Sequence, residues 1–371
     1  MGKQVLITGA AGFIGSHLAD ELLAQGYRVR GLDNLAPQVH GLSGKRPDYL
    51  SDDVELIVGD VRNPDDVRRA IRGVDAVFHY AAAVGVGQSM YQIAGYTDVN
   101  NLGTAVLLEA LSEQPIEKLV VASSMSLYGE GMYRTSDGRV VEGKIRPLQQ
   151  LKDSEWEVLD ERGCPMEPAP TPETKTPNLA SIYALSKFDQ ERMGLMIGQA
   201  YKIPTVALRF FNVFGTRQAL SNPYTGVLAI FASRLLNNKP PVIFEDGNQI
   251  RNFVSVKDVA TASRLALENP KVDGEVFNVG NERTYGVNEV AELIAKALDK
   301  DIQPEITGQY RVGDIRHCYP DMTKARNGLG FQAKIALEDG IGELAEWVAQ
   351  QEAADHVETM RRELNQRGLA L

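Results

Sequence analysis

The chain has 371 residues, of which 43% are hydrophobic and 24% charged, and its formal net charge is −10. This length exceeds what one hydrophobic core usually supports, so we expect two lobes in a globular enzyme of ordinary composition. The charge excludes an ordinary nucleic-acid binder, because the chain has no basic domain or stripe.

The sequence also argues against a metal site, a disulfide framework and a membrane segment. The two cysteines, Cys164 and Cys318, do not form a CxxC pair, and the five histidines are scattered singly. No apolar run has the length of a membrane span, and a strand at residues 4–7 leaves no room for a signal peptide. We therefore expect no metal, no membrane partner and a cytoplasmic location.

Short β-branched runs alternate with helical patterns through the first part of the chain. Strands are expected at residues 5–7, 29–32, 54–58, 76–79, 119–122 and 206–208, and helices at 13–25, 65–71, 99–111 and 182–200. This alternation is typical of βαβ units, and nearly continuous apolar strands are typical of a buried parallel sheet. We predict an α/β fold with a Rossmann-type, doubly wound parallel sheet.

The later part of the chain has a different character. Residues 216–250 contain one helical pattern and one short strand, and residues 280–371 are mostly helices and loops. We assign 1–215 and 251–279 to the doubly wound domain. The other two segments are assigned to a smaller, mostly helical C-terminal lobe over the carboxyl edge of the sheet, where such folds bind ligands. Residues 129–177 show no period and end in a cluster of prolines, which predicts a long irregular insertion.

A glycine-rich turn follows the first predicted strand directly. Gly9, Gly12 and Gly15 are spaced GxxGxxG, and the next helix begins within this turn. Glycine lets a backbone approach a pyrophosphate closely, and a helix N-terminus offers free N–H groups and a positive dipole end. The pattern alone is weak, but its place between strand and helix predicts a dinucleotide site.

Two acidic residues follow later strands. Asp33 closes the second strand, where a carboxylate can bind both ribose hydroxyls of NAD and would repel the 2′-phosphate of NADP. The alternative is a solvated turn residue, followed by Asn34. Asp60-Val61 follows the third strand, where an adenine could lie, and a helix N-cap region before Pro64 explains this pair nearly as well.

Tyr183 and Lys187 form a YxxxK motif in a helical pattern, so their side chains share one face. A free tyrosine has a pKa of about 10, too high for a base at neutral pH. Lowering that pKa by about 3 units takes roughly 4 kcal/mol, which Lys187 and a positive nicotinamide ring in a dry site can supply. Taken alone, the motif fits an exposed helix pair better than a catalytic one.

A pair of serines, Ser123-Ser124, follows the fifth predicted strand. A hydroxyl at that strand end could donate to a substrate oxygen or relay its proton. The alternative is a serine pair that caps a turn, which is common at such places.

Together these motifs resemble the extended short-chain dehydrogenase/reductase superfamily over nearly the whole chain. Within it the chain is most similar to the UDP-galactose 4-epimerase-like, NAD-dependent sugar-nucleotide epimerases and dehydratases. The motifs that carry the resemblance are Thr8-Gly9-x-x-Gly12-Phe13-Ile14-Gly15, Asp33, Asp60-Val61, His79-Tyr80-Ala81-Ala82, Asn100, Ser123-Ser124, Tyr183-x-x-x-Lys187, Arg209-Phe210-Phe211-Asn212-Val213-Phe214-Gly215, Arg251-Asn252-Phe253-Val254 and Arg311-Val312-Gly313-Asp314.

The resemblance implies a role for each matching residue. Tyr183 would be the base and acid at the sugar 4-hydroxyl, Lys187 would tune it and hold the nicotinamide ribose, and Ser124 would assist the proton transfer. The implied NAD-binding residues are Gly9, Gly12, Phe13, Ile14, Gly15, Asp33, Asn34, Asp60, Val61, Ala81, Ala82, Asn100, Tyr183 and Lys187. The implied substrate-binding residues are Ser124, Ser126, Asn212, Arg251, Arg311 and Asp314. The arginines would meet the nucleotide diphosphate, because their donor fork matches phosphate oxygens; a surface ion pair is the alternative for each.

The residues after Ser124 separate the reactions of this superfamily. Dehydratases carry an Asp-Glu pair there, decarboxylating relatives a Glu and 3,5-epimerases a cysteine, whereas this chain has Met125-Ser126. Asp33 argues against an NADPH-dependent reductase. The resemblance therefore implies C4 epimerisation through a transient 4-keto sugar, with NAD as a bound catalyst. Another dehydratase, dehydrogenase or reductase of this fold, or a degenerate NAD-binding scaffold, stays open as an alternative.

Finer features of the chain point to a subgroup and to two departures. Residues 89–91, 218–224 and 240–245 are more similar to dTDP-L-rhamnose 4-epimerases than to galactose enzymes, which implies a 6-deoxy-L-talose nucleotide as product. The insertion at 129–177 departs from the simplest members and either flanks the sugar pocket or is an external decoration or dimer contact. Ser255 stands where relatives often have His, which we expect to alter only packing.

The resemblance also implies how the protein is organised. The doubly wound domain would bind NAD and the smaller lobe the sugar nucleotide. Members commonly form homodimers through a four-helix interface. The apolar faces of helices 99–111 and 182–200 could provide that interface, but they could equally be internal core.

Overall fold

The structure, a computed structural model, describes residues 2–218, 226–311, 314–350, 362–363 and 366–368. Its main sheet has seven parallel strands in the order β13-β9-β5-β4-β1-β2-β3. These strands are β1 (Gln4–Thr8), β2 (Arg28–Asp33), β3 (Glu55–Val58), β4 (Ala76–His79), β5 (Lys118–Ser124), β9 (Thr205–Phe210) and β13 (Val276–Val279). The sheet confirms the predicted doubly wound α/β fold.

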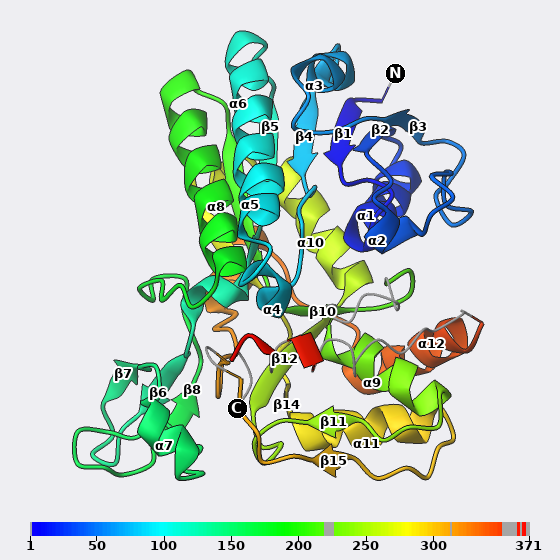
Figure 1. The fold of residues 1–371 in the computed structure, drawn as a ribbon. Helices are drawn as coiled ribbons and strands as arrows, with labels where there is room; N and C mark the ends of the chain where they lie inside the picture. The colour runs from blue at the N-terminus through cyan, green and yellow to red at the C-terminus, as the bar shows by residue number, and fades with distance from the viewer. Residues whose placement is uncertain (1, 219–225, 312–313, 351–361, 364–365, 369–371) are drawn as a thin grey trace.

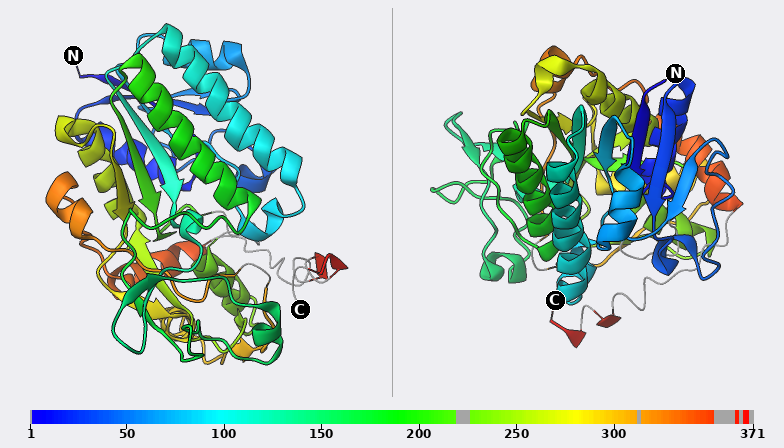
Figure 2. Two further views of the ribbon diagram at one scale, coloured as in Figure 1. Left: turned by 90° about the vertical axis from the view of Figure 1, so that its left-hand side faces the viewer. Right: turned by 90° about the horizontal axis from the view of Figure 1, so that it is seen from above.

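Helices cover both faces of this sheet (Figures 1 and 2). The helices of this part are α1 (Phe13–Ala24), α2 (Pro37–His40), α3 (Pro64–Ile71), α4 (Val86–Ser89), α5 (Ile93–Tyr96), α6 (Gly103–Glu113), α8 (Ile182–Tyr201) and α10 (Val256–Glu268). Short helical segments of other types are η1 (Thr97–Leu102), η2 (Met125–Tyr128), η3 (Pro270–Val272) and η4 (Ala325–Leu329). The helix expected at 99–111 thus begins as the π-helical segment η1 and continues as α6.

Alternate residues of the buried strands supply two separate cores. On β1, Val5 and Ile7 pack against the side of α1 and α10, whereas Leu6 faces the side of α3, α6 and α8. Successive side chains of a strand point to opposite faces, so a strand buried on both sides must be apolar throughout. This is why the strands appeared in the sequence as continuous apolar runs.

A second lobe lies below the carboxyl ends of the strands in Figure 1. Its elements are α9 (Val227–Leu236), α11 (Val287–Ala297), α12 (Leu337–Ala349), β10 (Asn212–Phe214), β11 (Val242–Ile243), β12 (Ile250–Ser255), β14 (Thr284–Gly286) and β15 (Glu305–Ile306). Its own core includes Phe214, Leu235 and Ile294. The division into two domains stays a prediction, because one strand takes part in both cores. Val254 of β12 packs in the core of the main sheet, and Phe253 of the same strand packs in the core of the lobe.

The insertion at 129–177 is more ordered than its sequence suggested. It contains β6 (Met132–Arg134), β7 (Val140–Glu142), α7 (Leu148–Lys152) and β8 (Glu167–Ala169), and the strands pair antiparallel as β7-β6-β8. Tyr133, Val158 and Met166 form a small core of its own. In Figure 1 this sheet lies at the lower left, beside the second lobe. Across the chain, no helix of the described residues is long and apolar enough to cross a membrane.

Candidate active site

The glycine turn joins β1 to α1 at the carboxyl edge of the main sheet. Gly9 has a φ of +76°, and a Cβ there would lie 2.9 Å from the backbone nitrogen of Ala81. A Cβ on Gly15 would collide with the Gly9 carbonyl oxygen, whereas one on Gly12 would meet that oxygen only at 3.4 Å. The protein itself therefore requires Gly9 and Gly15, while Gly12 borders open space at the N-terminus of α1, which has no side-chain cap. This cradle fits a pyrophosphate.

Asp33 is bound to the same turn. Its Oδ2 accepts a hydrogen bond from the backbone nitrogen of Ala11, and its Oδ1 accepts one from that of Leu35, both at 2.9 Å. The residue is only 9% exposed, so the alternative of a solvated turn residue does not describe it. Its contact with the ribose of NAD stays a prediction.

Asn34 and Asp60 lie side by side at the ends of neighbouring strands. The Asn34 amide donates to Asp60 Oδ2 at 3.0 Å, and Arg62 donates to the same oxygen at 2.7 Å. Hydrogen bonds from Arg62 hold the pKa of Asp60 well below its ordinary value. The helix cap before Pro64 is Asn63, whose side chain accepts from the backbone of α3, so Asp60 does not fill that role.

Asn100 ties the loop after β4 to the helix that carries the tyrosine. Its Oδ1 accepts from the backbone nitrogen of Ala83 at 2.7 Å, and its Nδ2 donates to Ser186 Oγ at 2.8 Å. Asn100 is fully buried. Ala81 and Ala82 precede Ala83 in the same loop, so all three residues lie between the glycine turn and α8.

Ser124, Ser126 and Tyr183 come together where β5 ends. Ser124 is the last residue of β5, so the strand continues two residues beyond the end predicted from the sequence and includes both serines. Its Oγ accepts from the backbone nitrogen and the hydroxyl of Ser126, at 3.2 and 2.9 Å, so it does cap the next turn. The side chain of Ser124 also interacts with the phenol of Tyr183, at the start of α8, and lowers the pKa of that phenol. The capping and the catalytic interpretations of this serine are thus compatible.

Burial controls the ionisation of Tyr183 and Lys187. Burial raises the pKa of the Tyr183 phenol, against a smaller lowering by the Ser124 hydrogen bond. Burial likewise lowers the pKa of Lys187 to about 7, and the charge of Glu191 opposes this only in part. The lowered phenol pKa expected from the sequence is therefore not a property of the protein by itself, because desolvation outweighs the contact with Ser124 and the Lys187 ammonium group does not contribute to the shift.

A second group contains the residues expected to hold the nucleotide. Arg311 Nε donates to Asp314 Oδ2 at 2.8 Å, and the Arg311 guanidinium lies 4.7 Å from the centre of the Phe244 ring. Arg251 is half-buried, and desolvation lowers its pKa, while the charge of Asp314 opposes that shift. Asn212 lies on β10 and donates to the carbonyl of Asn252 on β12. Val312 and Gly313, like residues 219–224 of the subgroup motif, lie outside the described residues.

Arg251 is also bound to the chain that carries Asp314. Its guanidinium donates to the carbonyl oxygen of Arg316 at 2.9 Å and to that of Ile315. Ile315 in turn packs on a hydrophobic cluster that contains Met125, Leu127 and Cys318. Because Met125 follows Ser124 directly, this one cluster joins the catalytic turn to the predicted nucleotide-binding residues.

The insertion is tied to this second group by buried ion pairs. Arg146 bonds both oxygens of Glu245, at 3.0 and 2.8 Å, and also donates to the carbonyl of Asp314 at 3.2 Å. Arg316, which is fully buried, bonds Glu245 at 3.0 Å and also pairs with Glu157 of the insertion. Of the alternatives left open by the sequence, an external decoration does not describe a segment bound in this way.

Several buried polar residues of the site were not identified from the sequence. Arg209 pairs with Glu191 at 2.6 Å, and Glu191 also accepts from Ser123 Oγ at 2.7 Å. Close by, the buried side chains of His79 and Gln190 both bond Thr104, and Gln190 accepts from Lys187, so they form one hydrogen-bond network. The only sequence signal for His79 was its place in the motif before Ala81, and Gln190 carried none.

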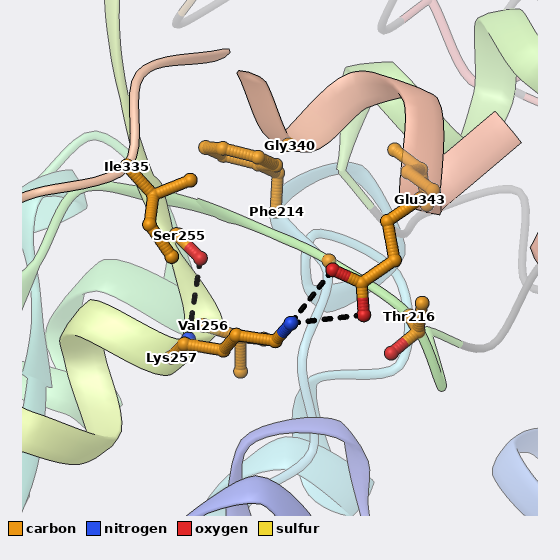
Figure 3. Close-up of a pocket in the computed structure, with 10 residues that line it drawn as sticks. Phe214, Thr216, Ser255, Val256, Lys257, Ile335, Gly340 and Glu343 are labelled. Atoms are coloured by element: carbon orange, nitrogen blue, oxygen red, sulfur yellow. Dashed lines mark hydrogen bonds and ion pairs between the residues drawn. The ribbon is translucent and has the colours of Figure 1, made fainter. Parts of the chain in front are cut away.

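A small cavity at the start of α10 is distinct from this site. Its volume is about 20 Å³, enough for roughly one water molecule. Figure 3 shows its lining, with Lys257 and Glu343 paired across it at 2.7 Å. Ser255 caps α10 there by accepting from the Lys257 backbone nitrogen, a hydrogen-bonding role that the sequence did not predict. None of the residues predicted to bind cofactor or substrate lines this cavity.

The comparisons with known proteins agree with this geometry. Residues 5–150 and 162–280 match the model of the NAD dependent epimerase/dehydratase family. A dTDP-L-rhamnose 4-epimerase of Burkholderia thailandensis is 35% identical over 360 residues, which cover 94% of this chain and 96% of that protein. The crystal structure of Thermotoga maritima UDP-glucose 4-epimerase with UDP-glucose superposes with a TM-score of 0.75 at 31% identity, covering 93% of this chain and 98% of that one. The Thermus thermophilus UDP-glucose 4-epimerase complex with NAD gives 0.73 at 32%, covering 94% and 99%.

Proposed function

This chain belongs to the NAD-dependent epimerase/dehydratase family, and we propose that it inverts C4 of a nucleotide-activated hexose through a transient 4-keto sugar. The observation that carries the proposal is that the side chains of Ser124 and Tyr183 come together, with Lys187 one helical turn further along α8, at the sheet edge that also bears the glycine turn. The turn after Ser124 continues with Met125 and Ser126, which supply no acid for the loss of water or carbon dioxide.

The residues of the glycine turn and its neighbours would hold NAD. Open space at Gly12 admits the pyrophosphate, and Asp33 at the end of β2 would meet the adenosine ribose. When bound, NAD supplies a reversible hydride acceptor and a positive charge beside the phenol. That charge would lower the pKa of the Tyr183 phenol, which burial raises in the cofactor-free protein.

The proton steps belong to Tyr183 and Ser124. The phenolate of Tyr183 would accept the proton of the sugar 4-hydroxyl as C4 is oxidised, and the phenol would return it when C4 is reduced on its other face. The hydroxyl of Ser124 would donate a hydrogen bond to the sugar 4-oxygen, or accept one from it, and so hold that oxygen in place. Arg251, Arg311 and Asp314 would grip the nucleotide diphosphate and its ribose meanwhile, which lets the sugar turn without leaving.

Within the family we propose a dTDP-6-deoxyhexose substrate, with dTDP-L-rhamnose converted to dTDP-6-deoxy-L-talose. The support is the similarity to the Burkholderia enzyme over nearly the full length of both chains, and the segments at 89–91 and 240–245. We also propose a homodimer through α8 and its neighbour η1. Leu102, Leu185 and Met196 are 48%, 41% and 54% exposed there, although helices of this part pack their other faces into the core.

The test is to incubate the purified protein with dTDP-, UDP- and GDP-hexoses and to resolve the products at C4 by NMR, while recording NADH by absorbance. Isomerisation without net NADH supports the proposal, whereas loss of water or net turnover of the cofactor contradicts it. Tyr183→Phe should abolish the isomerisation. Tyr201→Phe, at the exposed end of the same helix, is the matched control and should leave it unchanged.

A further inference from the structure

Lys187 is anchored by a residue that the proposed mechanism does not yet use. Its Nζ donates to Gln190 Oε1 at 2.8 Å, and both side chains are buried, at 4% and 0% exposure. On α8, positions 183, 187 and 190 fall on one helix face, so Gln190 lies on the same face as Tyr183, one turn beyond Lys187.

The orientation of the Gln190 amide follows from its neighbours. Lys187 can only donate, so the amide oxygen must face it. The amide nitrogen then donates to Thr104 Oγ1 at 2.9 Å. Thr104 gives its own proton to the carbonyl of Asn100 at 2.5 Å, and it is therefore free to accept.

The donors and acceptors around His79 likewise determine which of its ring nitrogens carries the proton. Thr8 Oγ1 accepts from the backbone nitrogens of Tyr80 and Ala81, so its hydroxyl donates to His79 Nδ1 at 2.9 Å. The proton of His79 is then on Nε2, which donates to Thr104 Oγ1 at 2.8 Å. The Gln190 amide nitrogen, 3.2 Å from the same Nε2, is then in van der Waals contact with it and gives its hydrogen bond to Thr104. Burial lowers the pKa of His79 to about 3, so the ring stays neutral and this arrangement persists across the working range of pH.

The result is a directed chain of hydrogen bonds from the end of β1 to the catalytic helix. It runs from Thr8, which precedes the glycine turn, through His79 to Thr104, and Thr104 fixes the amide of Gln190. No donor in this chain is left to rotate, so the Gln190 carbonyl has one orientation. Lys187 has three donor protons, and this contact uses one of them and leaves two for a ligand and the phenol.

We propose that Gln190 is a positioning residue that fixes the ammonium group of Lys187 and sets its charge for the proton step at Tyr183. The inference rests on the proposed function for the identity of that step. It makes a separate statement about the cofactor-free protein: the Gln190 carbonyl, together with the charge of Glu191, stabilises the protonated form of the buried Lys187.

The test compares Gln190→Met with Gln190→Glu. Methionine keeps the length of the side chain without a strong acceptor, and glutamate adds a negative charge at the same distance. The titration of Lys187 is followed in the cofactor-free protein by NMR of 13Cε-labelled lysine, with Lys187→Met to assign the signal. We expect Lys187 to titrate lower by about one unit in Gln190→Met and higher by at least about one unit in Gln190→Glu. Gln199→Met, on an exposed position of the same helix, should not move it.

Opposite shifts distinguish positioning from a structural role. Loss of packing alone would shift the pKa of Lys187 in the same direction in both variants or leave it unchanged, and either outcome overturns the inference. In the active enzyme, the limb of the kcat–pH profile that follows Lys187 should move with the NMR titration, while the KM for the sugar nucleotide stays within about twofold. If the wild type epimerises no sugar nucleotide but the titrations still diverge, the proposed function fails and this inference stands.

Discussion

Replacing Arg146 by methionine should loosen the insertion from the second lobe. Arg146 is 6% exposed and donates to four oxygens: both of Glu245, the carbonyl of Trp156 and the carbonyl of Asp314. Removing one partner of a buried ion pair costs about 3–5 kcal/mol, because the other charge is left without compensation. Because Glu245 still has Arg316 as an ion-pair partner at 3.0 Å, we expect a loss of unfolding free energy at the lower end of this range, about 3 kcal/mol. That is a large part of a typical stability of about 5–15 kcal/mol.

The chain offers a direct assay, since its two tryptophans lie on either side of this junction. Trp156 belongs to the insertion and Trp347 to α12, so a Trp347→Phe background leaves fluorescence that reports on the insertion alone. Urea unfolding of Arg146→Met in that background should show an earlier transition than the parent. Arg139→Met, whose side chain is exposed on the same insertion, is the control. A loss below about 1 kcal/mol would show that the buried ion pairs do not join the two parts, and the reasoning would be wrong.

Three further outcomes follow from the site. Gly12→Ala should weaken NAD binding at least tenfold and leave urea unfolding nearly unchanged. Gly15→Ala should instead destabilise the fold, because a Cβ at Gly15 collides with the protein and one at Gly12 does not. Equal losses of stability in the two variants would contradict this. In the cofactor-free protein the pKa of Lys187 lies near 7 instead of 10.5, so the unfolded chain binds more protons between these values and the contribution of Lys187 to the unfolding free energy rises with pH. The unfolding free energy of Lys187→Met should therefore exceed that of the wild type most at pH 7 and below. If this difference does not shrink towards pH 10, the lowered pKa of Lys187 is refuted. Leu185→Glu with Met196→Glu should convert the proposed dimer to a monomer in light scattering, and an unchanged mass would rule out this face.

The main sheet could be predicted from the sequence because burial on both faces leaves each parallel strand apolar. Val77 and Phe78 of β4 face opposite cores, so the strand had to be hydrophobic at successive positions. Gly9 was equally accessible to prediction, since its positive φ and the nearby backbone allow no other residue. The motif spacing likewise identified Tyr183 and Lys187 as a pair on one helix face.

The features that the sequence did not reveal depend on partners far along the chain. The strands of the insertion have three residues each, too short for a period, and Tyr133 there is held by Glu130 at 2.6 Å and by a local core. The π-helical start of the helix at 97–102 cannot be told from an α-helix by periodicity, since the bonds of Asn100 to Ala83 and Ser186 arise only in the fold. The partners of His79 were hidden for the same reason, because the network spans more than a hundred positions.

The pairing of the insertion's strands has a consequence for how this enzyme could be remodelled. Met132 of β6 lies opposite Ala169 of β8, so the segment leaves the body of the protein and returns to it at adjacent points. Closing such a hairpin depends little on how many residues lie beyond its base. The exposed turn at 136–139, between β6 and β7, could therefore be exchanged or fused to a reporter, as long as Arg146 and Glu157 keep their ion pairs with Glu245 and Arg316.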